Sequence, residues 1–315
     1  MTEEITDFKG KKFYKYPDIA RLGHDDCRDI LVYPEDTLII EEKVDGGNGS
    51  FWVDDETGLV YEGSRNRNLI TDEDEKTFCK QRLKLRELLE GKKLNQDYIY
   101  YIEWMAKHTI FYTDAPDIIG LDIRIKHAAN QEGCGLFIGR ESKEQEFERL
   151  GIEVTPLIWK GTVKEIKEKE IMELIPKSKY YDGFAEGIVI KNMVRKSHKG
   201  NHQLYAKVVR DEFKECNKAV FGGVRNKNND TSKIIEEFAT DARIQKIAIK
   251  FINEENMLLD LKLMSKVPTA VIKDILKEEF SNIFEKYKFI DFKEMKQKIS
   301  KKCLIKLREM MELNK

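Results

Sequence analysis

The chain has 315 residues, of which 41% are apolar and 36% are charged, and its formal net charge is −1. This apolar content fills a sizeable core, which excludes a chain that is disordered along its whole length. The near-zero net charge identifies no partner because it hides local patches: ten lysines and arginines stand against three acids between Lys191 and Lys227, a balance that suits phosphate binding.

Seven short runs rich in β-branched and aromatic residues alternate with turns up to about residue 225, and each run predicts a strand. The polar residues of Asp54–Gly58 predict a hairpin turn between the second and third runs. Two helices interrupt the strands, one over roughly 72–89 and one over 142–150. The predicted strands cover residues 37–44, 49–53, 59–64, 97–105, 118–125, 187–191 and 203–209.

From Thr231 onward the strand patterns disappear, and apolar residues recur at helical spacing. Thr231, Pro268 and Asp291 stand where helices are expected to begin. The polar residues 226–230 form the expected boundary between the strand-rich part and the helical part of the chain. The sequence therefore predicts an α+β chain with a β-rich domain over residues 1–226 and a small all-helical domain over residues 231–315.

The five cysteines are scattered, and no pair is spaced like a zinc knuckle or a redox motif, so we expect reduced thiols. The amino-terminal residues lack the apolar run of a signal peptide, and no stretch approaches the ~20 apolar residues that span a bilayer. These features predict a cytoplasmic protein without a membrane partner, and they leave the oligomeric state open.

The strongest local signal is the run from Glu42 to Asn48, in which Lys43 ends a predicted strand and is followed by Asp45, Gly46 and Gly47. Glycines let the backbone turn tightly and approach a ligand closely. A lysine at such a corner can point into a binding site while the strand holds it from one side. Alone, the pattern is more typical of a solvated lysine before a hairpin than of a catalytic lysine.

Further motifs follow in order: Arg65 after the next hairpin, Glu103 in the strand over 97–105, and the run over 118–124. Glu186 and Lys191 then bracket a buried-looking strand, and Lys207 lies in the last predicted strand. Together these motifs resemble those of the covalent nucleotidyltransferases, which are the DNA ligases, RNA ligases and mRNA capping enzymes. The resemblance covers roughly residues 13–215.

Within this superfamily the chain is similar to the nick-sealing RNA ligases typified by a phage enzyme, the RNA ligase 2 family. The lysine motif continues to Asn48 as in that family, and the opening Phe13–Pro17 is similar as well. Capping enzymes and most DNA ligases carry a β-barrel after the last motif, whereas here a helical tail follows.

The chain departs from the superfamily pattern at three positions. Ile102 stands where a glycine usually precedes the acid, and Val209 stands where a second lysine usually follows Lys207. Leu121 stands where an aromatic residue often stacks on adenine. These departures concern the phosphate and base contacts rather than Lys43.

The resemblance implies an ATP-grasp-like adenylation domain of antiparallel sheets with flanking helices. It implies an ATP-dependent RNA ligase that transfers AMP to Lys43, then to an RNA 5′-phosphate, and finally joins that end to a 3′-hydroxyl. A lysine amine attacks phosphorus only when neutral, and its usual pKa is about 10.4, so nearby cations that lower the pKa assist the attack. The implied catalytic residues are Lys43, Lys191 and Lys207; the implied ATP-binding residues are Glu42, Lys43, Asn48, Arg65, Glu103, Glu186, Lys191 and Lys207; and Glu186 is the implied ligand of Mg²⁺.

Alternatives remain open at the level of the sequence. An ATP-dependent DNA ligase or a GTP-dependent capping-type nucleotidyltransferase uses the same lysine chemistry. A catalytically inactive RNA-binding homologue is a further alternative, and its only support is the valine at position 209. The RNA substrate is open as well: a nicked duplex, a broken tRNA loop or free single strands.

Overall fold

The computed structural model describes residues 5–6, 12–106, 110–126, 137–166, 168–197, 203–210, 230–287 and 290–312. The chain divides into two compact units, Met1–Val209 and Arg210–Lys315. The predicted boundary at residues 226–230 lies almost wholly outside the described residues. Within the described ranges, no helix has the length and apolar character needed to cross a membrane.

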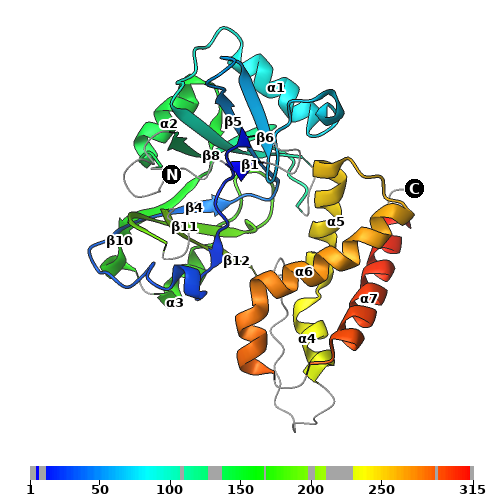
Figure 1. Ribbon diagram of the computed structural model, residues 1–315. Coiled ribbons are helices and arrows are strands. Elements are labelled where there is room, and N and C mark those ends of the chain that lie inside the picture. Colours follow the sequence, from blue (N-terminus) through cyan, green and yellow to red (C-terminus); the bar gives the residue numbers. More distant parts are fainter. Residues whose placement is uncertain are drawn as a thin grey trace. The chain divides into compact units, whose positions relative to one another are not determined.

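The first unit contains two five-stranded sheets and a short pair, β1 (Ile5–Thr6) with β2 (Lys12–Phe13) (Figure 1). All seven predicted strands are confirmed, and the sixth continues to Lys196. One sheet has the order β10 (Leu157–Thr162), β4 (Thr37–Lys43), β11 (Gly187–Lys196), β12 (Gln203–Val209) and β3 (Ala20–Arg21). The other has the order β6 (Val60–Ser64), β5 (Gly47–Val53), β7 (Tyr98–Trp104), β8 (Ile118–Ile125) and β9 (Glu153–Val154). Neighbours are antiparallel except β12 with β3 and β8 with β9.

Side-chain alternation along β7 sorts residues between two cores. Tyr100, Ile102 and Trp104 are buried in a cluster with residues of two helices, α1 (Cys79–Leu89) and α2 (Arg140–Arg149). Tyr101, on the opposite face, is buried in a cluster that also contains Tyr205 of β12 in the other sheet. The two sheets therefore meet through one face of each. The helices α1 and α2 cover the opposite face of the sheet that contains β7.

The predicted helix over 72–89 begins later than expected. Residues Asp72–Asp74 form a 3-10 turn, and the α-helix starts only at Cys79. Phe78 between them has φ of 50°, a left-handed conformation that interrupts a helix. Its ring stacks on Trp104 at 5.9 Å between centroids, so a tertiary contact overrides the local helical pattern. The helix predicted over 142–150 is confirmed with a start two residues earlier. The other short elements in the described part of the chain are η1 (Asp25–Cys27), η4 (Val163–Glu165), α3 (Glu168–Ile171) and η5 (Met172–Leu174).

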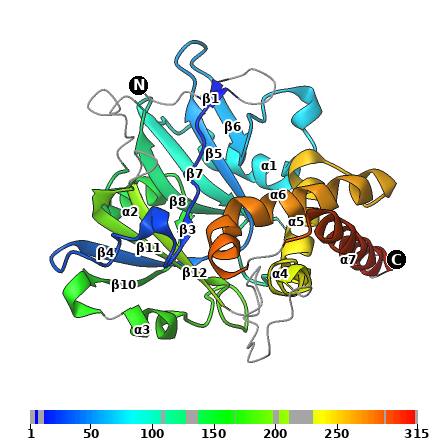
Figure 2. The ribbon, with the colours of Figure 1, turned by 60° about the horizontal axis from the view of Figure 1, so that its bottom comes forward.

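The second unit is helical, as predicted, with α4 (Asp230–Phe238), α5 (Asp241–Glu255), α6 (Leu261–Lys286) and α7 (Phe292–Glu312) (Figure 2). The expected helix start at Asp291 is confirmed, because its carboxylate accepts N–H groups from Lys293 and Glu294.

The expected helix start at Pro268 is wrong. The helix α6 begins at Leu261, capped by Asp260, whose carboxylate accepts N–H groups from Lys262 and Leu263. The cap satisfies the first donors, so the helix forms ahead of the proline. Pro268 is then buried inside the helix, where it has no N–H group to donate.

Candidate active site

Lys43 is the last residue of β4, and its side chain is 19% exposed. Its Nζ lies 2.5 Å from Oε2 of Glu186, which directly precedes β11. Gly187 is paired opposite Lys43, and a Cβ there would lie 2.0 Å from the carbonyl oxygen of Val208. Only glycine therefore allows β12 to approach β11 this closely beside Glu186.

The turn after Lys43 is held by hydrogen bonds from another segment. The buried Asp45 carboxylate accepts the Ile110 N–H at 2.9 Å, and the Asp45 N–H donates to the Tyr112 hydroxyl at 2.8 Å. Burial raises the pKa of Tyr112, so its hydroxyl stays protonated. The Gly46 N–H donates to Glu103 Oε1 at 3.1 Å. The backbone after Lys43 is thus held by the segment at Ile110 and Tyr112 and by Glu103 of β7.

Asn48 and Glu103 are directly opposite one another in the β5–β7 register, so both half-buried side chains emerge on one face. This places both predicted residues beside the turn that follows Lys43. Arg65 follows Ser64, which is paired with Gly49. Its guanidinium forms an ion pair with Asp18 of the amino-terminal segment.

The β4–β11–β12 register puts Lys43, Gly187 and Val209 in one row across the sheet. The next row on the same face contains Glu41, Val189 and Lys207. Lys207 therefore shares the face of Lys43, displaced by one row. Val209, which stands where the family usually has a second lysine, lies in the row of Lys43 itself.

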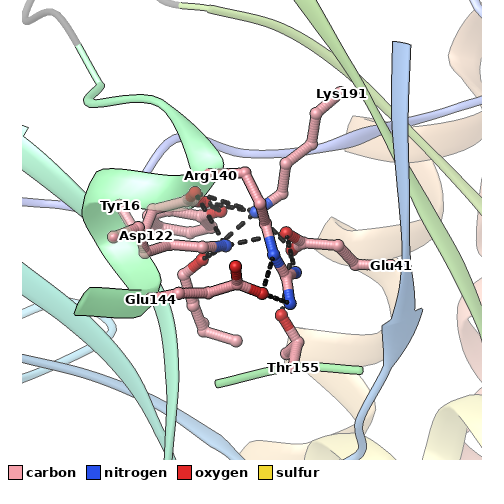
Figure 3. Close-up of polar contacts among 9 residues, drawn as sticks. Tyr16, Glu41, Asp122, Arg140, Glu144, Thr155 and Lys191 are labelled. Atoms are coloured by element: carbon pink, nitrogen blue, oxygen red, sulfur yellow. Dashed lines mark hydrogen bonds and ion pairs between the residues drawn. The ribbon is translucent and has the colours of Figure 1, made fainter. Parts of the chain in front are cut away.

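Lys191 lies on the same face but deeper, opposite Ile39, and it belongs to a buried ionic cluster (Figure 3). Its Nζ lies 2.7 Å from a Glu41 oxygen and 2.8 Å from both Asp122 oxygens. Burial alone would lower the pKa of Lys191, but Asp122 and Glu41 outweigh burial and raise it. The Lys191 ammonium therefore keeps its proton and is balanced by two carboxylates.

Glu41 receives two further cations from α2. Arg140 lies 2.5 Å and Lys143 2.7 Å from its Oε1, and Thr155 donates to its Oε2 at 2.9 Å. Burial opposes ionisation of Glu41, yet these cations and Lys191 hold its pKa well below the usual range. The cluster ties β4 to β8, β11 and α2 two residues before Lys43.

Sequence reasoning missed this cluster. A signal was present, since Glu41 and Asp122 interrupt otherwise apolar strand runs. Buried carboxylates require paired cations. The pairing with Arg140 and Lys143 was not visible, because those residues come from a helix far along the chain.

Glu42 is separated from the other predicted residues. Adjacent residues of a strand point to opposite faces, so Glu42 lies across β4 from Lys43. Its carboxylate accepts the Ser178 hydroxyl at 2.6 Å and the Lys179 N–H at 3.4 Å. Burial raises the pKa of Glu42, which those two donors partly oppose.

Glu186 is the acid that the sequence predicts as a ligand of Mg²⁺. Its side chain is 5% exposed, and it offers carboxylate oxygens beside Lys43. Among the described residues no group of three or more His, Cys, Asp or Glu side chains is arranged to hold a metal ion. A single carboxylate is compatible with Mg²⁺, which commonly binds one or two carboxylates and keeps several waters.

The two sheets with a strand-terminal lysine and its carboxylate partner are those of the nucleotidyltransferase superfamily. The chain belongs to the RNA ligase family, whose sequence profile matches residues 36–209. No curated protein matches the chain.

Among solved structures, the Naegleria gruberi RNA ligase with PPi matches with a TM-score of 0.49 and 14% identity, over 68% of this chain and 60% of that one. A variant of that enzyme with ATP and Mn matches with a TM-score of 0.47 over the same shares at 14% identity. A chain from Aquifex aeolicus, assigned as an ATP-dependent DNA ligase, matches with a TM-score of 0.43 and 18% identity, over 95% of this chain and 68% of that one.

Proposed function

We propose that this protein is an ATP-dependent RNA ligase of the cytoplasm that joins a 3′-hydroxyl to a 5′-phosphate through a covalent lysyl-AMP. The observation that carries the proposal is the placement of Lys43: a partly exposed amine 2.5 Å from Glu186, on a turn fixed by Asp45 and Glu103. Membership of the RNA ligase family supplies the class of substrate.

In the first step Lys43 Nζ forms a bond to the α-phosphorus of ATP, the bond from that phosphorus to the bridging oxygen breaks, and pyrophosphate leaves. The amine attacks only after it loses a proton. Glu186 Oε2, at 2.5 Å, lies within proton-transfer distance. Lys207, on the same face, is the residue that we assign to the charge developing on the α-phosphate.

In the second step an RNA 5′-phosphate oxygen attacks the same phosphorus and frees Lys43. In the third step a 3′-hydroxyl attacks the RNA phosphorus and AMP leaves. Glu103 and Asn48, which face the same side beside the lysine turn, are assigned to the ribose hydroxyls and the α-phosphate. Arg65 is assigned to a phosphate of the entering strand, in exchange for its contact with Asp18.

Glu186, together with water, would hold Mg²⁺, which would supply positive charge at the transferring phosphate when bound. Lys191 is assigned a positioning role for the nucleophile strand, since its charge is already balanced by Glu41 and Asp122. Glu42 is assigned to the nucleotide base through the segment at Ser178 that it anchors.

The test is incubation with α-labelled ATP and Mg²⁺. The parent protein is expected to become labelled, pyrophosphate is expected to remove the label, and Lys43→Ala is expected to abolish it. Lys296→Ala on the exposed face of α7 is the matched control and is expected to be labelled normally. Label retained by Lys43→Ala removes this residue from the mechanism, and tight RNA binding without any label indicates the inactive homologue.

Two comparisons separate the other ligase-type alternatives. Labelling with GTP in place of ATP indicates a capping-type enzyme. Sealing of nicked DNA in preference to nicked RNA indicates a DNA ligase. Defined nicked duplexes, broken hairpin loops and free single strands then identify the RNA substrate.

A further inference from the structure

One face of α6 presents lysines and phenylalanines to solvent. Exposed residues along it recur at spacings of three, four or seven, which keeps them on one side of a helix. These residues, hereafter the α6 stripe, are Lys262, Lys266, Lys273, Lys277, Phe280 and Phe284.

The acids of α6 lie elsewhere on the helix. The structure describes every residue of α6, and three of its four acids bind the fully buried guanidinium of Arg243. The nitrogen–oxygen distances are 3.2 Å to Asp274, 3.3 Å to Glu278 and 3.1 Å to Glu279. The buried arginine thus holds these three acids on another side of the helix, away from the stripe. Of the stripe lysines, Lys266 also pairs with Glu255 of α5 at 3.5 Å, and the face as a whole keeps a positive balance.

The two phenylalanines at the end of the stripe are unusually exposed. Phe280 is 59% and Phe284 75% exposed, although large apolar side chains are normally buried. Their rings stack with centroids 6.0 Å apart and planes 19° apart. The pair therefore offers aromatic surface to solvent next to a row of cations.

We propose that the α6 stripe binds single-stranded RNA, with its lysines on phosphates and its phenylalanines stacked on bases. Aromatic rings beside a positive track are the elements by which proteins hold single strands without reading sequence. The lysines from 262 to 277 extend over about 22 Å of helix, enough for several phosphates. Bases in a duplex are stacked on each other, so they cannot also stack on these rings.

The charge of the stripe distinguishes this partner from others. An acidic peptide would use the lysines but leave the rings without an assigned contact, and an apolar partner would bury four ammonium groups at high cost. Single-stranded RNA offers phosphates to the lysines and unpaired bases to the phenylalanine rings. The inference rests on the proposed function, since it takes RNA as the substrate.

The test is the affinity of the full-length protein for a fluorescein-labelled single-stranded RNA, measured by anisotropy at several salt concentrations. Phe280→Ala with Phe284→Ala is expected to weaken binding by about tenfold or more. Lys273→Gln with Lys277→Gln is expected to weaken binding and to lower the slope of log affinity against log salt by about 1.4. Leu258→Ala and Lys296→Gln, which alter exposed residues outside the stripe, are the matched controls and are expected to bind like the parent.

Self-adenylation of each variant is measured in parallel, because it needs ATP but no RNA. Normal adenylation with weakened RNA binding supports the inference. Normal adenylation with parental RNA affinity and salt slope overturns it, as does an equal loss in the control variants. Binding of a blunt duplex that falls as much as binding of the single strand overturns the stacking assignment. Failure of the parent to adenylate itself on Lys43 contradicts the proposed function instead.

Discussion

The Lys43 ammonium and the Glu186 carboxylate meet at 2.5 Å across β4 and β11, although the two residues are 143 positions apart in the chain. The pairing strands define this contact, because Gly187 is opposite Lys43 and Glu186 immediately precedes it. The same carboxylate is both the partner of the attacking amine and the candidate ligand of the metal ion.

Replacing Glu186 tests that double assignment. Glu186→Gln keeps the size of the side chain but removes the charge, and self-adenylation is expected to slow by about a hundredfold or more, in line with the loss of a key electrostatic group. The rate of label incorporation is measured over a range of Mg²⁺ concentrations. Glu56→Gln on the exposed hairpin is the control. A rate that equals that of the parent at every Mg²⁺ concentration would exclude Glu186 from the chemistry.

The buried cluster around Glu41 predicts a large effect on stability. Glu41→Ala leaves Arg140, Lys143 and Lys191 without a common carboxylate, and removing one partner of a buried ion pair costs about 3–5 kcal/mol. The shift of the urea midpoint measures the loss. Glu35→Ala, which breaks the exposed pair with Lys164, is expected to cost about 1 kcal/mol or less. Equal shifts in the two variants would show that the cluster does not hold the fold.

The same residue predicts a pH dependence of stability. The cations hold the pKa of Glu41 in the folded state below its ordinary value of about 4.5. A depressed pKa contributes stability that is fully present above pH 4.5 and is lost as the pH falls below it, because the unfolded state then binds the proton first. Unfolding midpoints between pH 7 and pH 3 should therefore fall less steeply for Glu41→Gln than for the parent. If the unfolding midpoints of Glu41→Gln and the parent fell equally with pH, the lowered pKa of Glu41 would be contradicted.

The close approach of β11 and β12 at Gly187 predicts that this position requires glycine. Gly187→Ala places a Cβ 2.0 Å from the Val208 carbonyl oxygen, so β11 and β12 must separate or shift. We expect a loss of about 2 kcal/mol or more together with slower self-adenylation, since overpacking usually costs about 1–3 kcal/mol. Gly139→Ala, at a glycine with nothing within 4 Å of the added Cβ, is the matched control. Thermal melting and label incorporation measure the two effects.

Local patterns in the chain were sufficient to predict seven strands and the helical second unit, because β-branched alternation and helical spacing are properties of neighbouring residues. They did not predict β10 or the two-residue strands β1, β2, β3 and β9. The differences in helix starts have tertiary causes. Phe78 adopts a left-handed conformation while its ring packs on Trp104, and this delays the start of the predicted helix to Cys79. Asp260 caps α6 eight residues ahead of Pro268, which the helix then accommodates.

For the candidate site, the sequence by itself determined which residue types were present and in what order: a lysine before an acid and two glycines, then the carboxylates and lysines of the later motifs. Only the tertiary structure decided which of them meet. Strand register brings Glu186 to Lys43 and Glu103 to Asn48, sends Glu42 to the opposite face, and binds Lys191 to Glu41 and Asp122. Register and facing depend on pairing between strands distant in the chain, and no local pattern of residues encodes that pairing.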